Sequence, residues 1–442
     1  MHRMLFAVGL ALGAAGAAHP LRADDVLPRL EQAVKAVTPS VLEWRQDFHA
    51  HPELSNREER TARVVAELLR QFGVDELKTG VARHGVVALI RGHQPGPTVA
   101  LRADMDALPI QEQTGLPFAS RNPGMMHACG HDAHTAMLLG AAKALCGLRE
   151  AMPGNVKLIF QPSEEGAPAG ERGGAAVMVE QGVLHDPDVA AIFGLHVNTE
   201  LATGKIGYRP GTIMAAVDRF RITVTGRQSH ASSPWQGIDP VVVSAHIVVA
   251  LQTIVSRKVD AREPAVVSVG VIQGGRAWNI IPQTVELEGT VRTHNADVRH
   301  QIAEHFRRIV EQTAAAHGAA ATITGFEDYA PAVWNDPELS RRMKPTLDRA
   351  AGQENVVEIQ PMMGGEDFAR YAEKVPGLYV MLGVRNEASG AIWPLHTPKM
   401  TLDEAALPLG VRTFCLLALD YLNRPADNAL IRQESGASLA VR

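Results

Sequence analysis

Residues 98–109 read TVALRADMDALP, an apolar run that leads into two acidic side chains, Asp104 and Asp106. The run at 98–103 has the length and composition of a buried strand. A helical pattern follows at 133–148. Further short apolar runs of the same kind lie at 86–90, 156–160 and 189–195. Strands interleaved with helices predict an α/β domain, with a mainly parallel sheet covered by helices on both faces.

The flanking segments extend this domain. The sequence at 55–58 has the pattern of a capping box and predicts a helix that ends before Gly73. Late in the chain, 377–383 has the pattern of another buried strand and 407–422 that of a closing helix. The last residues, 425–442, are polar and are expected to form a loosely ordered tail.

A different pattern begins near residue 212. Phe220, Ile222 and Val224 alternate with polar residues, as in a sheet with one solvated face. The predicted elements that follow are a helix at 239–257, strands at 265–273 and 283–292, a helix at 296–317 and a strand at 320–326. The order β-α-β-β-α-β is the split ferredoxin-like motif, which predicts a separate α+β domain inserted into the first one.

The first 23 residues have the layout of a secretory signal peptide, with Arg3, an apolar run and small residues before Asp24. The apolar run is shorter than the roughly 20 residues that span a bilayer. We therefore expect export, to a periplasm or out of the cell, and no membrane insertion after cleavage. No apolar stretch after residue 25 is expected to be long enough to cross a membrane. The predicted segments are 1–23 (signal peptide), 24–211 and 329–424 (the two parts of the larger domain), 212–328 (inserted domain) and 425–442 (tail).

Composition excludes several classes of protein. The 442 residues contain 43 Lys plus Arg and 48 Asp plus Glu, a formal net charge of −5. Hydrophobic residues make up 46% and charged residues 21%, which is unlike a disordered chain. The slight acidity and the lack of a Lys/Arg run argue against nucleic acid as a partner. The three cysteines are too few for a disulfide framework.

Side chains that bind metals gather where predicted strands end. After Asp104 and Asp106, such positions hold His127, Cys129, His131, Asp132, Glu164, Glu165, His196 and His396. Each alone also has a structural interpretation, such as a turn cap, a buried thiol or a core histidine. Together, a thiolate, imidazoles and carboxylates in one crevice form a ligand set for zinc or a similar divalent metal.

The spacing within these segments predicts how the side chains point. Cys129 and His131 are two residues apart, so an extended backbone would direct both to the same side. The adjacent Glu164 and Glu165 would diverge, which allows one to bind metal and the other to reach a water molecule. Other catalytic signatures are absent from the sequence: His-Glu-x-x-His, Gly-x-Ser-x-Gly, the P-loop and Gly-x-Gly-x-x-Gly. Cys129 could be a nucleophile, but a thiol hydrolase does not need the other ligand-type groups.

Three motifs carry a family resemblance. MHACGHDAH at 126–134, QPSEE at 161–165 and GGEDF at 364–368 resemble the hippurate hydrolase and auxin-conjugate amidohydrolase branch of the dinuclear metallopeptidases. The larger family includes aminoacylase and glutamate carboxypeptidase, and the similarity covers about 38–424. The resemblance implies two divalent ions, zinc or manganese, bound by Cys129, His131, Glu165, His196 and His396.

The resemblance also implies roles for five further residues. Glu164 would be the general base toward a water molecule that bridges the metals, and Asp106 would orient a metal ligand. The inserted domain would be a lid and dimerisation domain, in which His230 polarises the scissile carbonyl, often across a dimer interface. Asn279 and Arg292 would hold the carboxylate of the substrate.

The expected activity is hydrolysis of the amide bond in small N-acyl or N-aroyl amino acids, such as hippurate-like conjugates, by a homodimer. One alternative is a dipeptidase or carboxypeptidase with the same metal centre. Another is a non-catalytic exported protein that binds amino-acid conjugates. The presence of Glu164 argues against a binding protein, because binding requires no general base.

Overall fold

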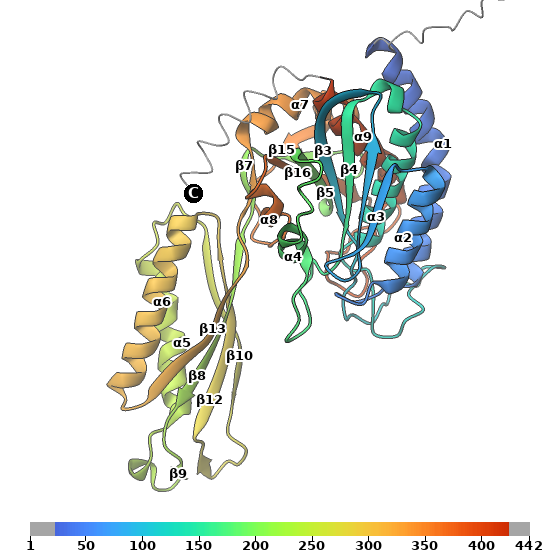
Figure 1. Cartoon of the computed structure of the whole chain (residues 1–442). Coiled ribbons are helices and arrows are strands. Elements are labelled where there is room, and N and C mark those ends of the chain that lie inside the picture. The colour runs from blue at the N-terminus through green and yellow to red at the C-terminus, as the bar shows by residue number, and fades with distance from the viewer. Residues whose placement is uncertain (1–22, 424–442) are drawn as a thin grey trace, which may run out of the picture.

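The structure is a computed structural model that describes residues 23–423 (Figure 1). Apart from Ala23, the predicted signal peptide lies outside the described residues, as does the whole predicted tail. The described chain forms a larger part on an eight-stranded sheet and a smaller part, here called the lid, on a four-stranded sheet. An antiparallel ribbon of β7 (Gly211–Met214) and β14 (Val333–Asn335) lies where the chain passes between the two.

The larger sheet is parallel at its centre. Its strand order is β1 (Glu76–Val81), β2 (Gly85–Arg91), β4 (Pro153–Gln161), β3 (Gln94–Asp104), β5 (Val189–Ala202), β16 (Gly377–Arg385), β6 (Ile206–Tyr208) and β15 (Val356–Glu358). The run β4-β3-β5-β16 is parallel, whereas β1, β2 and β6 each make antiparallel pairs. The α/β class and the apolar strands at the sheet centre were therefore predicted correctly from the sequence.

Helices cover both faces of this sheet. One face carries α1 (Ala23–Ala50), α2 (Glu59–Phe72), α3 (His131–Cys146), α7 (Pro337–Ala351) and α9 (Leu407–Leu422). The other carries the short helices α4 (Gly174–Glu180) and α8 (Ala369–Ala372). Helix α3 is buried along nearly its whole length between α1 and α9. A Cβ at Gly140 would lie 2.6 Å from Val41 and 2.9 Å from Val411, so this close helix packing requires glycine.

The start of α2 differs from the prediction. No side chain of the expected capping box caps the helix; instead, the Glu53 carboxylate accepts hydrogen bonds from the amides of Arg60 (3.0 Å) and Thr61 (2.8 Å). The box residue Ser55 donates its hydroxyl to Asp106, beside the candidate site. The predicted end is correct, because Gly73 closes the helix in the left-handed conformation with φ 76°.

The lid has the predicted β-α-β-β-α-β order. Its elements are β8 (Ala216–Thr225), α5 (Pro240–Arg257), β10 (Ala265–Gly274), β12 (Thr284–Thr293), α6 (Ala296–Ala316) and β13 (Ala320–Ala330). They form an antiparallel sheet in the order β10-β12-β8-β13, with both helices packed on it. Phe220, Ile222 and Val224 are buried as expected, and the Phe220 and Phe306 rings lie 4.6 Å apart at their centroids. The alternate residues of β8 and β12 therefore face away from the helices.

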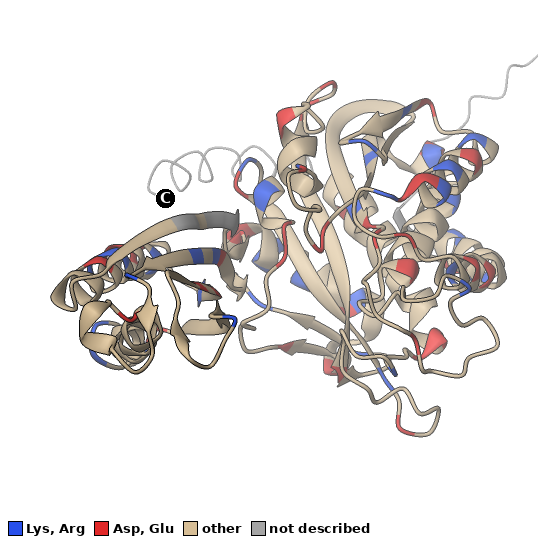
Figure 2. Cartoon of the chain, turned by 90° about the horizontal axis from the view of Figure 1, so that it is seen from below, with Lys and Arg blue, Asp and Glu red and all other residues tan. Residues whose placement is uncertain are grey.

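One expectation about apolar segments was wrong. Two helical stretches, Pro240–Arg257 and Glu404–Leu422, are long and apolar enough to cross a membrane by length and composition alone. The second is mostly buried in the core of the larger part, whereas only one-third of the first is buried, against the lid sheet. In Figure 2, basic and acidic residues are interspersed over both parts of the described chain.

Candidate metal centre

Several candidate metal ligands lie at the carboxyl ends of the central strands and at the start of α3. Asp104 is the last residue of β3, and His131 is the first residue of α3. Between Cys129 and His131, Gly130 has φ 90°, and a Cβ there would lie 2.4 Å from a methyl group of Val197. The expected convergence of Cys129 and His131 therefore results from a left-handed glycine at a helix start. The extended backbone predicted between them is wrong.

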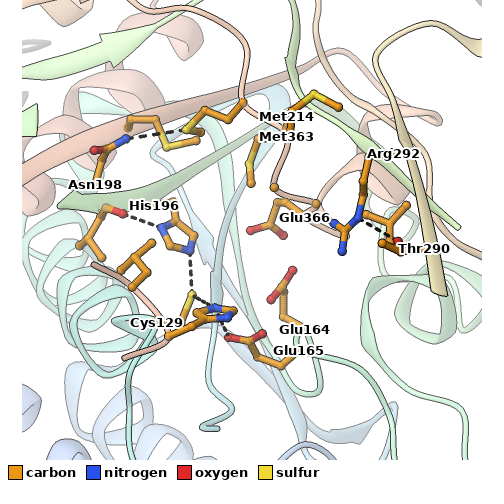
Figure 3. A pocket seen from close by; sticks show the side chains of 18 of the residues that line it. Cys129, Glu164, Glu165, His196, Asn198, Met214, Thr290, Arg292, Met363 and Glu366 are labelled. Carbon is orange, nitrogen blue, oxygen red and sulfur yellow. Dashed lines mark hydrogen bonds and ion pairs between the residues drawn. The ribbon is translucent and has the colours of Figure 1, made fainter. Parts of the chain in front are cut away.

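Four of the five predicted metal ligands are linked by short distances (Figure 3). The Cys129 Sγ atom lies 3.3 Å from His196 Nε2 and 3.2 Å from His396 Nε2. His396 Nε2 in turn lies 3.2 Å from Glu165 Oε1. The fifth, His131, belongs to three groups, and within each group the donor atoms all lie within 4.8 Å of one another: Cys129-His131-His196, His131-Glu164-Glu165 and Asp104-His131-His134.

The donor set fits a pair of divalent metal ions. It combines a thiol, imidazoles and carboxylates within the span of two adjacent coordination spheres. His131 donates from Nδ1 to the backbone carbonyl of Asp106 at 2.9 Å, while its buried Nε2 has no hydrogen-bond partner in the structure. A buried imidazole nitrogen that faces a thiol and two carboxylates is the arrangement that metal coordination requires.

Asp106 organises the loop that carries the two glutamates. Its carboxylate accepts hydrogen bonds from the backbone amides of Glu164 and Glu165, both at 3.0 Å, and from the Ser55 hydroxyl at 2.6 Å. It also lies 3.3 Å from His131 Nδ1. Asp106 therefore fixes both the orientation of an imidazole and the position of the neighbouring carboxylates.

Burial and like charges raise the pKa values of two acids in this centre. Burial raises the pKa of Glu164 well above its ordinary value, and the carboxylates of Glu366 and Glu165 raise it further. Burial likewise raises the pKa of the Cys129 thiol, with Glu165 as the next cause. The group thus concentrates negative charge that bound divalent cations would neutralise.

The pKa values of two buried predicted ligands, His131 and His196, shift in opposite directions. Burial lowers the pKa of His131, but Asp104 and Asp106 outweigh it and raise the pKa to about 10. For His196, burial and the neighbouring His134 hold the pKa well below its ordinary value, so this ring is neutral and can donate an electron pair.

A cavity of about 670 Å³ opens on this centre. One wall is formed by Glu164 and four of the predicted metal ligands, Cys129, Glu165, His196 and His396, and the facing wall by lid residues that include Arg292 and Thr290. Arg292 donates from Nε to the Thr290 hydroxyl at 3.0 Å. The remaining wall is apolar and contains Met214, Val217, Met362, Met363, Met381 and Leu395. The cavity therefore offers a cation and an apolar surface beside the carboxylates.

The structure does not bring His230 and Asn279 to this cavity. They lie on neighbouring strands, β9 (Ser229–His230) and β11 (Ile280–Ile281) with its preceding loop, and the Ala231 amide donates to the Asn279 carbonyl at 3.0 Å. Figure 1 places β9 at the end of the lid far from the larger sheet. His230 is exposed there. Within one chain, these two residues are thus separated from the other predicted site residues.

Arg102, which was not among the predicted site residues, is fully buried beneath the centre. Its guanidinium contacts the carboxylates of Asp104 at 2.5 Å and of Glu366 and Asp367, each at 2.9 Å. A signal was present in the sequence, because an arginine inside the apolar run at 98–103 must find buried partners.

Comparison with known proteins agrees with this geometry. The model of peptidase family M20/M25/M40 matches residues 100–420. The chain is 41% identical over 401 residues to thermostable carboxypeptidase 1 of Saccharolobus solfataricus, covering 90% of this chain and 100% of that one. It is 42% identical over 390 residues to an N-acetylcysteine deacetylase of Bacillus subtilis, covering 88% and 99%.

A solved structure shows the same fold. The crystal structure of a Bacillus subtilis dinuclear metal-binding peptidase from the M20 family is 40% identical, with a TM-score of 0.74, and the match covers 88% of this chain and 99% of that one. Family, fold and metal-ligand geometry lead to one conclusion. The chain belongs to peptidase family M20/M25/M40 and is a metal-dependent amidohydrolase or peptidase.

Proposed function

We propose that this protein hydrolyses the amide bond of N-acyl or N-aroyl amino acids with two divalent metal ions, as in the hippurate hydrolase and auxin-conjugate branch of the family. The observation that carries the proposal is the position of Glu164. Its buried carboxylate lies on the cavity wall, in a group with His131 and Glu165 whose ligand atoms are within 4.8 Å of one another.

The metal ions would be held by Cys129, His131, Glu165, His196 and His396. When bound, such ions lower the pKa of water and stabilise the oxyanion that develops on the amide. Glu164 would take a proton from the attacking water and deliver it to the leaving nitrogen.

The cavity supports a substrate with one anionic end. Arg292 lines the cavity on the side opposite Cys129, and a guanidinium can bind a substrate carboxylate through two hydrogen bonds. The methionine-rich wall would accept the acyl group, because flexible thioether side chains adapt to different apolar shapes.

The direct test is Glu164→Ala. We expect the variant to bind as much zinc or manganese as the wild type, measured by elemental analysis, and to lose nearly all turnover of N-benzoylglycine and N-acetyl-L-cysteine. Ser163→Ala, which changes the neighbouring residue of the same loop, is the matched control and should stay active. Full activity of Glu164→Ala would refute the assignment of the base.

A carboxypeptidase or dipeptidase activity is the second candidate, supported by the similarity to the Saccharolobus solfataricus carboxypeptidase over that protein's full length. Parallel assays of N-benzoylglycine and of unblocked dipeptides separate the two, since a dipeptidase needs a site for the free amine. Faster hydrolysis of the unblocked dipeptides would replace the first proposal. Stoichiometric binding without turnover in the metal-loaded protein would support a binding protein instead.

A homodimer would reconcile the remote positions of His230 and Asn279 with a role at the site. We propose that the lid forms the interface, because α5 and the edge strand β10 expose apolar side chains: Val241, Val242, Val249, Val271 and Ile272. In such a dimer, His230 of one chain would act at the cavity of the other. Sedimentation equilibrium tests the oligomeric state.

Export is proposed from the sequence of the first 23 residues. The expected product is a protein in the periplasm or outside the cell that lacks these residues. Mass spectrometry of the mature N-terminus tests the cleavage, and recovery of peptides from residues 1–15 in the purified protein would contradict it.

A further inference from the structure

Beneath the cavity, one cation holds three carboxylates from two distant segments of the chain. Arg102 donates from Nη1 to Asp104 and from Nη2 to Glu366 and Asp367, and its Nε donates to Gln161 Oε1 at 2.9 Å. Arg102, Asp104, Gln161 and Glu366 are all at most 1% exposed. Because the guanidinium is planar, these contacts fix where the acceptors lie relative to one another.

Glu366 and Asp367 also accept hydrogen bonds from groups other than Arg102. Glu366 accepts the amide of Phe368 at 2.9 Å and the hydroxyl of Tyr379. Asp367 accepts the Gln161 amide group at 2.7 Å and the amide of Ala175 at 2.7 Å. The side chains of Glu366 and Asp367 thus accept several hydrogen bonds each. These bonds hold the backbone of the turn in a defined position.

That backbone reaches the proposed base. The amide N–H of Asp367 points at Glu164 Oε1, with 3.4 Å between nitrogen and oxygen. Carboxylate oxygens of Glu164, Glu366 and Asp367 lie within 4.8 Å of one another. Three acids at this separation repel one another when ionised, and the guanidinium of Arg102 is the cation that contacts two of them.

We infer that Arg102 and Glu366 are positioning residues of the hydrolytic reaction, which hold the Glu366–Asp367 turn so that the Asp367 amide faces the Glu164 carboxylate. This inference rests on the proposed role of Glu164. On its other side, Arg102 is connected through Asp104 to residues beside the predicted metal ligands. Asp104 contacts His134 Nδ1 at 2.6 Å, and His134 Nε2 accepts the amide of Val197, the residue after His196.

The test uses the metal-loaded full-length protein with three substitutions. Arg102→Met keeps the length of the side chain but removes the charge and the donors, Arg102→Lys restores one charge, and Glu366→Gln removes a charge at nearly constant shape. Arg342→Met is the matched control, since Arg342 is another buried arginine, bonded to the Tyr421 carbonyl at 3.0 Å between α7 and α9.

We expect Arg102→Met to bind the wild-type amount of metal, to keep KM for N-benzoylglycine and N-acetyl-L-cysteine within about threefold, and to lose about 100-fold in kcat. Arg102→Lys should recover part of this loss, and Glu366→Gln should lose about 10-fold in kcat at constant KM. Arg342→Met should lower the unfolding temperature without changing kcat. If Arg102→Met does not fold, Glu366→Gln decides the question.

A crystal structure provides a readout that does not depend on activity. In Arg102→Met, or in Glu366→Gln if the first does not fold, we expect the Asp367 amide and Glu164 Oε1 to separate beyond hydrogen-bond distance. An unchanged separation, a kcat within threefold of wild type, or a loss of kcat explained by lost metal would overturn the inference. Glu164→Ala is assayed in parallel. If it stays active, the proposed base is wrong; if it is inactive while Arg102→Met is fully active, only the positioning inference fails.

Discussion

The carboxylate of Asp106 accepts a hydrogen bond from the backbone amide of Glu164 at 3.0 Å. Asp106 follows strand β3, whereas Glu164 follows strand β4, and these strands are parallel neighbours in the sheet. The bond therefore joins the ends of two strands at the point where the proposed base leaves the sheet. It explains how the loop can hold a buried carboxylate in one position.

Replacing this acceptor should weaken both metal binding and turnover. In Asp106→Ala, the amides of Glu164 and Glu165 lose their acceptor, and His131 Nδ1 loses one of two nearby oxygens. We expect a loss of about 10- to 100-fold in metal affinity, measured by competition with a chromophoric chelator. Ser55→Ala removes only one of the bonds to Asp106 and is the control, with an affinity within about threefold of wild type.

Metal removal should destabilise the protein through the same group of ligands. Chelation with EDTA is expected to abolish hydrolysis and to lower the unfolding temperature by several degrees, since a ligand present at about 100 times its Kd contributes about 2.7 kcal/mol to stability. Zinc or manganese should restore both. Cys129→Ser should respond weakly to EDTA, whereas Cys146→Ser, a thiol of α3 outside the ligand group, should respond like wild type.

The contact between the lid and the larger part depends on a missing side chain at Gly365. A Cβ there would lie 2.1 Å from a Val217 methyl group and 3.3 Å from Arg292 Nη1. Gly365→Ala should displace the lid wall of the cavity and lower kcat/KM by about 10-fold or more. At Gly364, the nearest atom would be the Met214 methyl group at 3.4 Å, an ordinary contact. A similar loss in Gly364→Ala would show that the effect is not specific to the lid contact.

The fold could be predicted from the spacing of apolar residues, because that spacing reflects which side chains are buried. The runs at 98–103 and 189–195 became the parallel strands β3 and β5, and the alternation from Phe220 to Val224 became the lid strand β8. Features without an apolar pattern were not predicted. The short strand β15 and helix α7 are examples, because a three-residue strand and a helix with an internal proline give weak signals.

The residues of the site could be predicted where their type alone suggests metal binding. Roles that depend on contacts formed only in the folded chain could not. Cys129, His196 and His396 converge although they are far apart in sequence. His196 does not end its strand as the sequence predicted, because β5 continues to Ala202. The role of Ser55 was not predicted, because a hydrogen bond between loops leaves no periodic signal in a sequence. The apolar run around Arg102 indicates that its side chain needs buried partners, but not which residues these are. His230 lies far from the cavity within one chain, so its predicted role would require the proposed dimer.

Stability should depend on pH through the buried carboxylate of Asp132. Burial raises its pKa, but Arg45 at 2.9 Å and His49 at 2.8 Å outweigh this and hold the pKa well below its ordinary value. A lowered pKa in the folded state adds stability above the unfolded pKa of about 3.9, and this stability is lost as pH falls below it. Asp132→Asn should therefore cost about 3 kcal/mol at pH 7 and about 1 kcal/mol less than that near pH 3.

Urea unfolding of both proteins in EDTA, at pH 7 and pH 3, measures this difference without a contribution from bound metal. Asp260→Asn removes an exposed carboxylate that pairs with Arg262, and it should change the unfolding midpoint little at either pH. An equal effect of Asp132→Asn at the two pH values would contradict the assigned ion pair.

Mixing two inactive variants tests whether His230 acts across a dimer interface. His230→Ala and Glu164→Ala should each lack activity, and His230→Ala should unfold at the wild-type temperature because His230 is exposed. In a mixed dimer, the subunit with an intact Glu164 faces the intact His230 of its partner. Random exchange makes half of the dimers mixed, each with one complete site, so the mixture should recover about a quarter of wild-type activity. A mixture that stays inactive after proven subunit exchange would contradict the proposed action of His230 across a dimer interface.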